Sequence, residues 1–125
     1  MNVVDSSAWL EYLAAGPNAA FFAEAVENVA ELIVPTVSIY EVFKRIVQQR
    51  SENEALQVVA VMQQGVIAEM DSTVALSAAR ISLDHQLPMA DSIMLATARL
   101  NGATLWTQDA HFEGMHNVRY RKSSR

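Results

Sequence analysis

The sequence contains no cysteine and no long apolar run. Disulfide bonds and thiolate metal sites are therefore excluded, which is compatible with a reducing compartment. No stretch approaches the roughly 20 consecutive apolar residues that a membrane-spanning helix needs. The first residues, with Asp5 among them, also lack the basic segment and apolar core of a signal peptide. We expect a cytoplasmic protein without membrane contact.

Positive charge is scarce, because nine Lys and Arg residues stand against 14 Asp and Glu residues and leave a net charge of −5. This balance argues against a protein that coats nucleic acid by bulk electrostatics. The cations are nevertheless clustered, with Arg50 near the end of the first cluster and Arg125 at the end of the second. Those expected to hold an RNA backbone are Lys44, Arg45, Arg119, Arg121 and Lys122. The alternative for the second cluster is a solvated, frayed chain end.

Glycine and proline are few, and most of them lie between apolar segments with a strand or helix pattern. Short apolar runs predict strands at 1–4, 32–35, 66–70, 104–107 and 118–120. Helical patterns and caps predict helices at 8–13, 18–28, 36–49, 51–64, 73–85 and 90–100. Strands that alternate with helices predict a three-layer α/β/α fold with a mostly parallel sheet of four to five strands. We expect one domain over residues 1–120 and a basic tail over 121–125.

Four carboxylates lie where a predicted strand ends or a predicted helix begins: Asp5, Glu41, Asp91 and Asp109. In an open parallel sheet these positions converge on one edge. Like charges held close together repel unless a cation neutralises them, and Mg²⁺ or Mn²⁺ does so with oxygen ligands. An acid such as Asp91, taken alone, is more often a charge that stabilises a helix N-terminus. The set of four predicts a metal-dependent enzyme of phosphoryl transfer.

The motifs around these acids are VVDSSAWL (3–10), VPTVSIYEVFKR (34–45), LPMADSIMLATA (87–98) and LWTQDAHF (105–112). Together they resemble PIN-domain nucleases, and within that family the VapC-type toxins of type II toxin–antitoxin systems. The resemblance covers residues 2–119. It implies a PIN-like fold and a metal site of Asp5, Glu41, Asp91 and Asp109 that uses Mg²⁺ or Mn²⁺ to cleave RNA.

The resemblance also implies partners, namely an RNA substrate, a second copy of the chain in a homodimer and a cognate antitoxin. The antitoxin would cover the acidic site and a groove between the first helical hairpin and the helix that carries Glu41. Aromatic residues are concentrated in this part of the chain, and core packing explains most of them. Two other roles stay open: a housekeeping RNA-processing nuclease, and a catalytically silent PIN module.

The four acids are expected to have unequal roles. Asp5 is expected to be the central ligand and Asp91 to bind directly or through water, since Mg²⁺ keeps part of its hydration shell. Glu41 would bind the metal or orient the attacking water, and Asp109 is expected to act more indirectly. Thr107 is expected to orient a carboxylate or a water, and for Ser6 a helix cap is an equal alternative. These two residues are supporting candidates and not nucleophiles.

Two histidines near Asp109 suggest a second kind of site. His111, His116 and Asp109 together would suit a transition metal ion, but a spacing of five does not place the two rings on one helical face. We therefore expect both to be surface or loop histidines.

Overall fold

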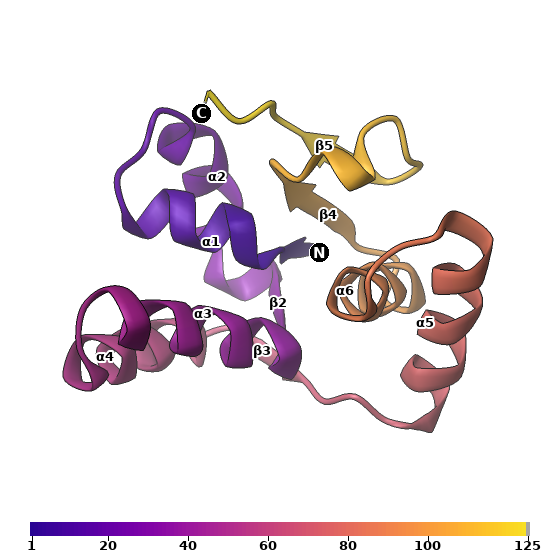
Figure 1. The fold of residues 1–125 in the computed structure, drawn as a ribbon, viewed down its shortest axis with the longest axis horizontal. Helices are drawn as coiled ribbons and strands as arrows, with labels where there is room; N and C mark the ends of the chain where they lie inside the picture. The colour runs from indigo at the N-terminus through magenta and orange to yellow at the C-terminus, as the bar shows by residue number, and fades with distance from the viewer. Residues whose placement is uncertain (125) are drawn as a thin grey trace.

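A five-stranded parallel sheet forms the centre of the protein, whose computed structural model describes residues 1–124. The strands follow the spatial order β3-β2-β1-β4-β5. Their bounds are β1 Asn2–Val4, β2 Leu32–Pro35, β3 Val66–Ala68, β4 Thr104–Thr107 and β5 Val118–Tyr120. All five predicted strands are present, although β3 ends two residues before the predicted limit of 66–70. Figure 1 shows β1 and β4 side by side, and the pairing of Val4 with Trp106 joins their last parts.

Six α-helices cover the sheet. Their bounds are α1 Ser6–Leu13, α2 Ala19–Val26, α3 Thr36–Gln49, α4 Glu52–Met62, α5 Ser72–His85 and α6 Met89–Leu100, with short 3₁₀ turns η1 Val29–Glu31 and η2 Ala110–Phe112. The first four helices form two helical hairpins, because α1 packs on α2 and α3 packs on α4. None of the helices in residues 1–124 is long and apolar enough to span a membrane.

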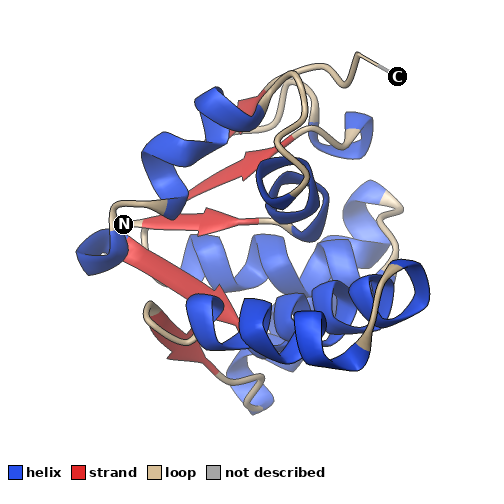
Figure 2. Ribbon diagram, turned by 90° about the vertical axis from the view of Figure 1, so that its left-hand side faces the viewer, coloured by secondary structure: helices blue, strands red, loops and turns tan. Residues whose placement is uncertain are grey.

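The inner strands β1, β2 and β4 bury side chains on both of their faces, as expected for a parallel sheet between two helical layers, whereas the edge strands β3 and β5 are more exposed. Val3 and Leu105 join the core formed with α5 and α6, whereas Val4 and Trp106 join the core formed with α1, α2, α3 and α4. Figure 2 shows helices on both sides of the strands. The predicted three-layer α/β/α architecture is confirmed.

Helix boundaries follow from local capping. Asp5, and not Ser6, is the N-cap of α1: its side chain accepts a hydrogen bond from the Ala8 N–H at 3.0 Å. The helix therefore begins two residues before the predicted start. After α6, Gly102 has a φ of 60°, a left-handed conformation that glycine adopts without the steric cost of a Cβ.

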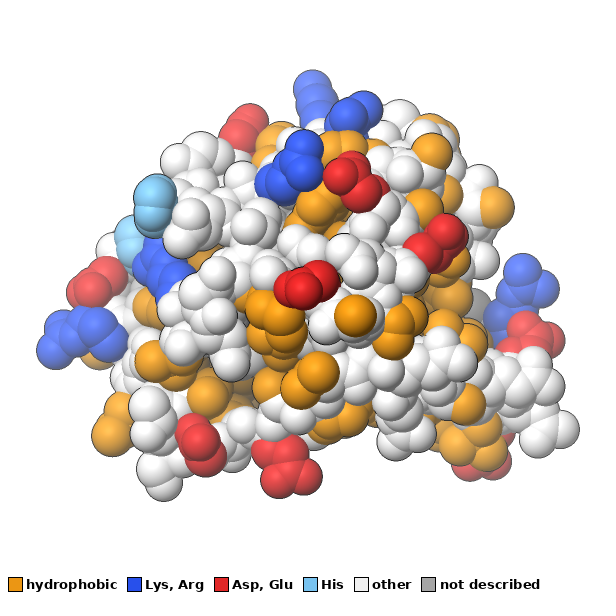
Figure 3. All heavy atoms as spheres, turned by 180° about the vertical axis from the view of Figure 1, so that it is seen from behind, with side chains coloured by type: hydrophobic (Ala, Val, Ile, Leu, Met, Phe, Trp, Pro, Cys, Tyr) orange, Lys and Arg blue, Asp and Glu red, His pale blue; other side chains and the backbone are white. Residues whose placement is uncertain are grey.

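The last residues are attached to the sheet. The Arg121 N–H donates to the Thr107 carbonyl at 3.0 Å, and the Lys122 carbonyl accepts from the Asn18 side chain at 3.0 Å. Arg125, which belonged to the predicted basic cluster, lies outside the described residues. Figure 3 shows Lys and Arg side chains at the top of the back of the molecule and at its left and right edges, while acidic side chains are scattered among hydrophobic ones.

Candidate metal-dependent active site

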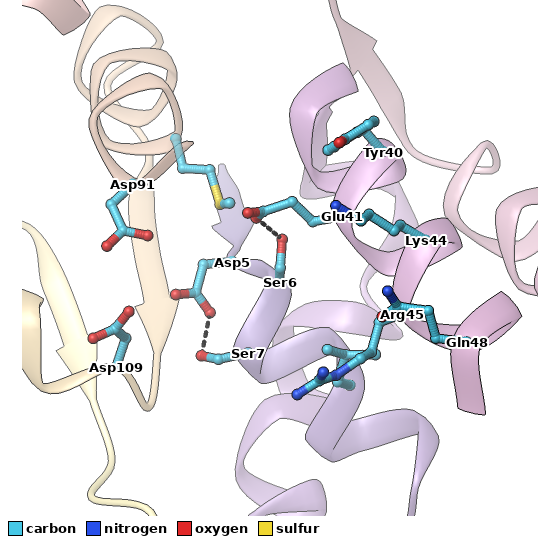
Figure 4. A pocket seen from close by; sticks show the side chains of 12 residues that line it. Asp5, Ser6, Ser7, Tyr40, Glu41, Lys44, Arg45, Gln48, Asp91 and Asp109 are labelled. Carbon is cyan, nitrogen blue, oxygen red and sulfur yellow. Dashed lines mark hydrogen bonds between the residues drawn. The ribbon is translucent and has the colours of Figure 1, made fainter. Parts of the chain in front are cut away.

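The four predicted acids line one cleft at the carboxyl edge of the sheet. Asp5 directly follows β1, and Asp109 follows β4 by two residues. The chain leaves β1 toward β2 on one side and returns through β4 on the other, so the cleft lies at a topological switch point, where open α/β sheets bind ligands. The cleft has a volume of about 460 Å³, and Glu41 from α3 and Asp91 from α6 complete its acidic wall. Figure 4 shows the four carboxylates directed toward the same space.

Asp5 is the most buried of the four, with 2% of its surface exposed. One carboxylate oxygen accepts hydrogen bonds from the Ser7 hydroxyl at 2.7 Å and the Ala8 N–H at 3.0 Å, and the other accepts from the Thr107 hydroxyl at 2.6 Å. Burial raises the pKa of Asp5 to about 6; the three donors counteract this effect in part, and the charge of Asp109 adds to it. Burial of the charged carboxylate of Asp5 therefore lowers the free energy of unfolding.

Asp91 and Asp109 lie close together in the cleft (Figure 4), with His111 beside them. Nδ1 of His111 lies 3.1 Å from Oδ2 of Asp91 and 3.3 Å from Oδ1 of Asp109. Burial raises the pKa of Asp91, and the nearby charges of Asp109 and Glu41 raise it further, while His111 opposes the shift. The hydrogen bond to Asp91 and the charge of Asp109 raise the pKa of His111 in turn. His111 is an exposed histidine in the segment after β4, as expected, and its ring also contacts two acids of the site, which the sequence did not predict.

Glu41 is connected to the first helix. Its Oε1 accepts a hydrogen bond from the Ser6 hydroxyl at 2.7 Å, which links α3 to α1 across the cleft (Figure 4). The hydroxyl of Ser6 is therefore directed at an acid of the site and does not cap the helix. Glu41 lies on the cleft side of α3 because the buried positions Val42 and Ile46 fix the rotation of that helix.

Thr107 connects two of the acids. The Thr107 side chain is fully buried, and its hydroxyl donates to Asp5 and accepts from the Asp109 N–H at 2.9 Å. A hydroxyl group can donate one hydrogen bond and accept another at the same time, so Thr107 links the carboxylate of Asp5 to the backbone of Asp109. These two hydrogen bonds fix the position of the end of β4, and of the loop that follows it, relative to the end of β1.

A family model for the PIN domain matches residues 3–117. The chain belongs to the PIN domain family. The resemblance that the four motifs carried is confirmed at this level. A comparison with curated protein sequences gives no significant match.

Solved structures share the fold over nearly the whole chain. A toxin–antitoxin complex from Klebsiella pneumoniae is similar with a TM-score of 0.78 at 20% identity, covering 95% of this chain and 96% of that one. VapC20 from Mycobacterium tuberculosis, a toxin that cleaves the sarcin–ricin loop, has a TM-score of 0.76 at 14% identity, covering 95% and 99%. FitAcB from Neisseria gonorrhoeae has a TM-score of 0.73 at 19% identity, covering 96% of each chain. The predicted PIN-like fold is confirmed by these likenesses.

The acids of this PIN domain fit a hard divalent cation. Ligand atoms of Asp91, Asp109 and His111 all lie within 4.8 Å of one another. Asp5 is buried beside them, and its carboxylate is sensitive to the charge of Asp109. Carboxylate oxygens are the donors that Mg²⁺ and Mn²⁺ take in proteins, and a cation would offset their mutual repulsion. His116 does not belong to this group of ligand atoms among residues 1–124.

The predicted RNA-binding cations fall into two sets in the PIN domain. Lys44 and Arg45 line the acidic cleft. Arg119 and Arg121 do not line it; the guanidinium of Arg119 lies 4.5 Å from the ring centroid of Trp106, and that of Arg121 lies 4.3 Å from the ring centroid of Phe21. These contacts hold two of the C-terminal cations against the aromatic side chains of β4 and α2.

Proposed function

We propose that this PIN domain is a metal-dependent endoribonuclease toxin that hydrolyses RNA phosphodiester bonds and is inhibited by a cognate antitoxin. The observation that carries the proposal is the convergence of Asp5, Glu41, Asp91 and Asp109 on one cleft that Lys44 and Arg45 also line. Nuclease chemistry needs acids that hold a cation and basic side chains that hold the phosphate backbone, and this cleft offers both. The RNA-cleaving action of the similar VapC20 toxin supports RNA as the substrate.

In this proposal Asp91 and Asp109 hold Mg²⁺ or Mn²⁺ together with Asp5. A bound cation of this kind makes a water more acidic and offsets the charge that develops on the phosphate. Glu41 accepts the proton of the attacking water through Oε2, since Oε1 is engaged by Ser6. Lys44 and Arg45 hold the neighbouring phosphates. Water attacks phosphorus and the bond to the 3′ oxygen breaks, so the products carry 5′-phosphate and 3′-hydroxyl ends.

The antitoxin has a surface to occupy beside the acids. A second cleft of about 430 Å³ lies between α1, α3 and α4 and shares Ser7, Leu10 and Arg45 with the acidic cleft. Ile46 and Val58 give it an apolar wall. A partner helix with an apolar face would fit such a groove and could reach the acids. The similarity to a toxin–antitoxin complex from Klebsiella pneumoniae supports an antitoxin as the partner. We further propose a cytoplasmic homodimer.

Asp91→Asn tests the proposed activity, because it keeps the shape of the side chain and removes the charge that holds the cation. We expect RNA cleavage to fall at least 100-fold, about the loss of one strong stabilising group in a transition state, with an unchanged circular dichroism spectrum. The assay uses purified protein and RNA with Mg²⁺ or Mn²⁺, with and without EDTA.

Sequencing of RNA ends after brief expression tests the products and the biological role. We expect 5′-phosphate ends at a small set of sites, together with growth arrest that co-expression of the antitoxin relieves. Products with 2′,3′-cyclic phosphate would contradict hydrolysis by an activated water. Cleavage without growth arrest would favour a housekeeping nuclease, and folded protein without cleavage in either metal would favour a silent module.

A further inference from the structure

His111 is held in place beside the acid pair by its own turn. Its N–H donates to Oδ1 of Asp109 at 2.9 Å, which caps the 3₁₀ turn η2. The next residue, Phe112, is fully buried in the core with α6 and anchors the other end of the turn. The backbone of His111 is thus fixed on both sides, even though 56% of the side chain is exposed. Its ring is aimed at the two acids by this turn.

The distances from the imidazole are those of neighbouring ligands around one ion. Nδ1 lies 3.1 Å from an oxygen of Asp91 and 3.3 Å from an oxygen of Asp109. Adjacent ligands of an octahedral ion at 2.0–2.2 Å are separated by about 3 Å. All three ligand atoms lie within 4.8 Å of one another. A single cation could therefore contact one nitrogen and two oxygens without a large movement of the chain.

We propose that His111 is a nitrogen ligand of the cation that Asp91 and Asp109 hold, and that it makes this site select a first-row transition metal ion such as Mn²⁺ over Mg²⁺. This inference rests on the proposed function for the presence of a cation. Mg²⁺ prefers an all-oxygen environment, whereas imidazole nitrogen strengthens the binding of transition metal ions. The ligand set distinguishes this cleft from one made of carboxylates alone.

A different role for His111 makes the opposite prediction. As a counter-ion, a positively charged ring would occupy the place of the cation and compete with it. Removing such a competitor would strengthen metal binding. Removing a ligand weakens it, and weakens it most for the ion that prefers nitrogen. The sign of the change in affinity therefore separates the two roles.

Metal titration of three proteins by calorimetry provides the test: the wild type, His111→Ala and His116→Ala. His116 is the matched control, since it is exposed in the same segment and is not among the grouped ligand atoms. We expect His111→Ala to lose about tenfold or more in Mn²⁺ affinity and to change in Mg²⁺ affinity by less than about threefold. His116→Ala should match the wild type. Equal losses for both ions, or tighter Mn²⁺ binding by His111→Ala, would overturn the proposal.

Spectroscopy of bound Mn²⁺ identifies the ligand directly. Electron spin-echo measurements on protein labelled with ¹⁵N-histidine should show coupling of Mn²⁺ to a histidine nitrogen in the wild type and in His116→Ala. The coupling should vanish in His111→Ala, whose fold circular dichroism checks. Absence of nitrogen coupling in the wild type would refute the proposal even if RNA is cleaved. Nitrogen coupling in a protein that cleaves no RNA would leave the ligand assignment intact and refute the proposed function instead.

Discussion

At the scale of single residues, Asp5 shows that a residue suited to the proposed function can lower the stability of the fold. It is buried, it accepts three hydrogen bonds, and it still has a pKa of about 6. An unfolded chain would hold the same carboxyl at 3.8. Between these two values the folded state binds more protons than the unfolded state, so the free energy of unfolding decreases as the pH rises from about 4 to 6.

Asp5→Asn should remove this pH dependence. Above pH 7 the buried charge costs up to about 3 kcal/mol in the absence of metal, and the amide carries no charge. We expect the variant to be more stable than the wild type at pH 8 and no more stable at pH 4, measured by denaturant unfolding in EDTA. Asp84→Asn, at an exposed position of α5, is the control and should show no such difference between the two pH values. Lower stability of Asp5→Asn at both pH values would mean that its hydrogen bonds outweigh its burial.

The sequence was sufficient to predict which four acids lie at the site, but not which of them lie next to one another. Asp109 was expected to act indirectly, yet its ligand oxygen is grouped with that of Asp91, while the oxygens of Asp5 are engaged by three protein donors. The contact of His111 with the two acids could not be predicted from helical spacing, because this segment is not an α-helix. Residues 110–112 form a 3₁₀ turn capped by Asp109, and that turn places the histidine two residues beyond the acid beside it. The feature of the sequence that could have identified His111 is its position only two residues after Asp109.

At the scale of elements, the junction between α5 and α6 sets the position of Asp91. Gln86 ends α5 in the left-handed region, with a φ of 55°. The Leu87 carbonyl then accepts from the hydroxyls of Ser82 at 2.8 Å and Ser92 at 3.3 Å. The sequence predicted a break before Asp91, because Pro88 interrupts the helical pattern, but position 86 is a glutamine, so no glycine marks the left-handed residue.

Gln86→Gly should stabilise the protein by about 0.5–1 kcal/mol, because glycine adopts a positive φ without the steric cost of a Cβ. Gln63→Gly is the matched control: Gln63 also ends a helix and is exposed, but its φ is −71°. That variant should be neutral or destabilised. Thermal unfolding measures both. Equal effects of the two substitutions would show that the left-handed conformation stores no strain at Gln86.

At the scale of the whole molecule, the order of the strands was not readable from the sequence. Periodicity and turn residues identify strands, but the inner strands β1, β2 and β4 are similar in being mostly buried, and nothing local specifies which strands pair. The position of β1 between β2 and β4 is a result of packing over the whole chain. This order turns four separate acids into one site.

Few cations lie near the site of a chain with a net charge of −5, so RNA binding should depend weakly on salt. If Lys44 and Arg45 make the phosphate contacts, a plot of the logarithm of the RNA-binding constant against the logarithm of the salt concentration should have a slope of about −1.4. Each phosphate contact to a single strand contributes about −0.7 to this slope. Measurements use Asp91→Asn to prevent cleavage. Adding Lys44→Ala and Arg45→Ala should flatten the slope, whereas adding Arg119→Ala and Arg121→Ala should not. The reverse result would assign the backbone contacts to the C-terminal cations.

The hydrogen bond between the side chains of Asp5 and Thr107 joins residues that are 102 positions apart in the chain. During synthesis, the first acid leaves the ribosome long before β4, the strand that completes its surroundings. The cleft can form only after residue 109 has also emerged. The acidic cleft is therefore incomplete during most of the translation of this chain, because its assembly waits until β4 is available to pair with β1.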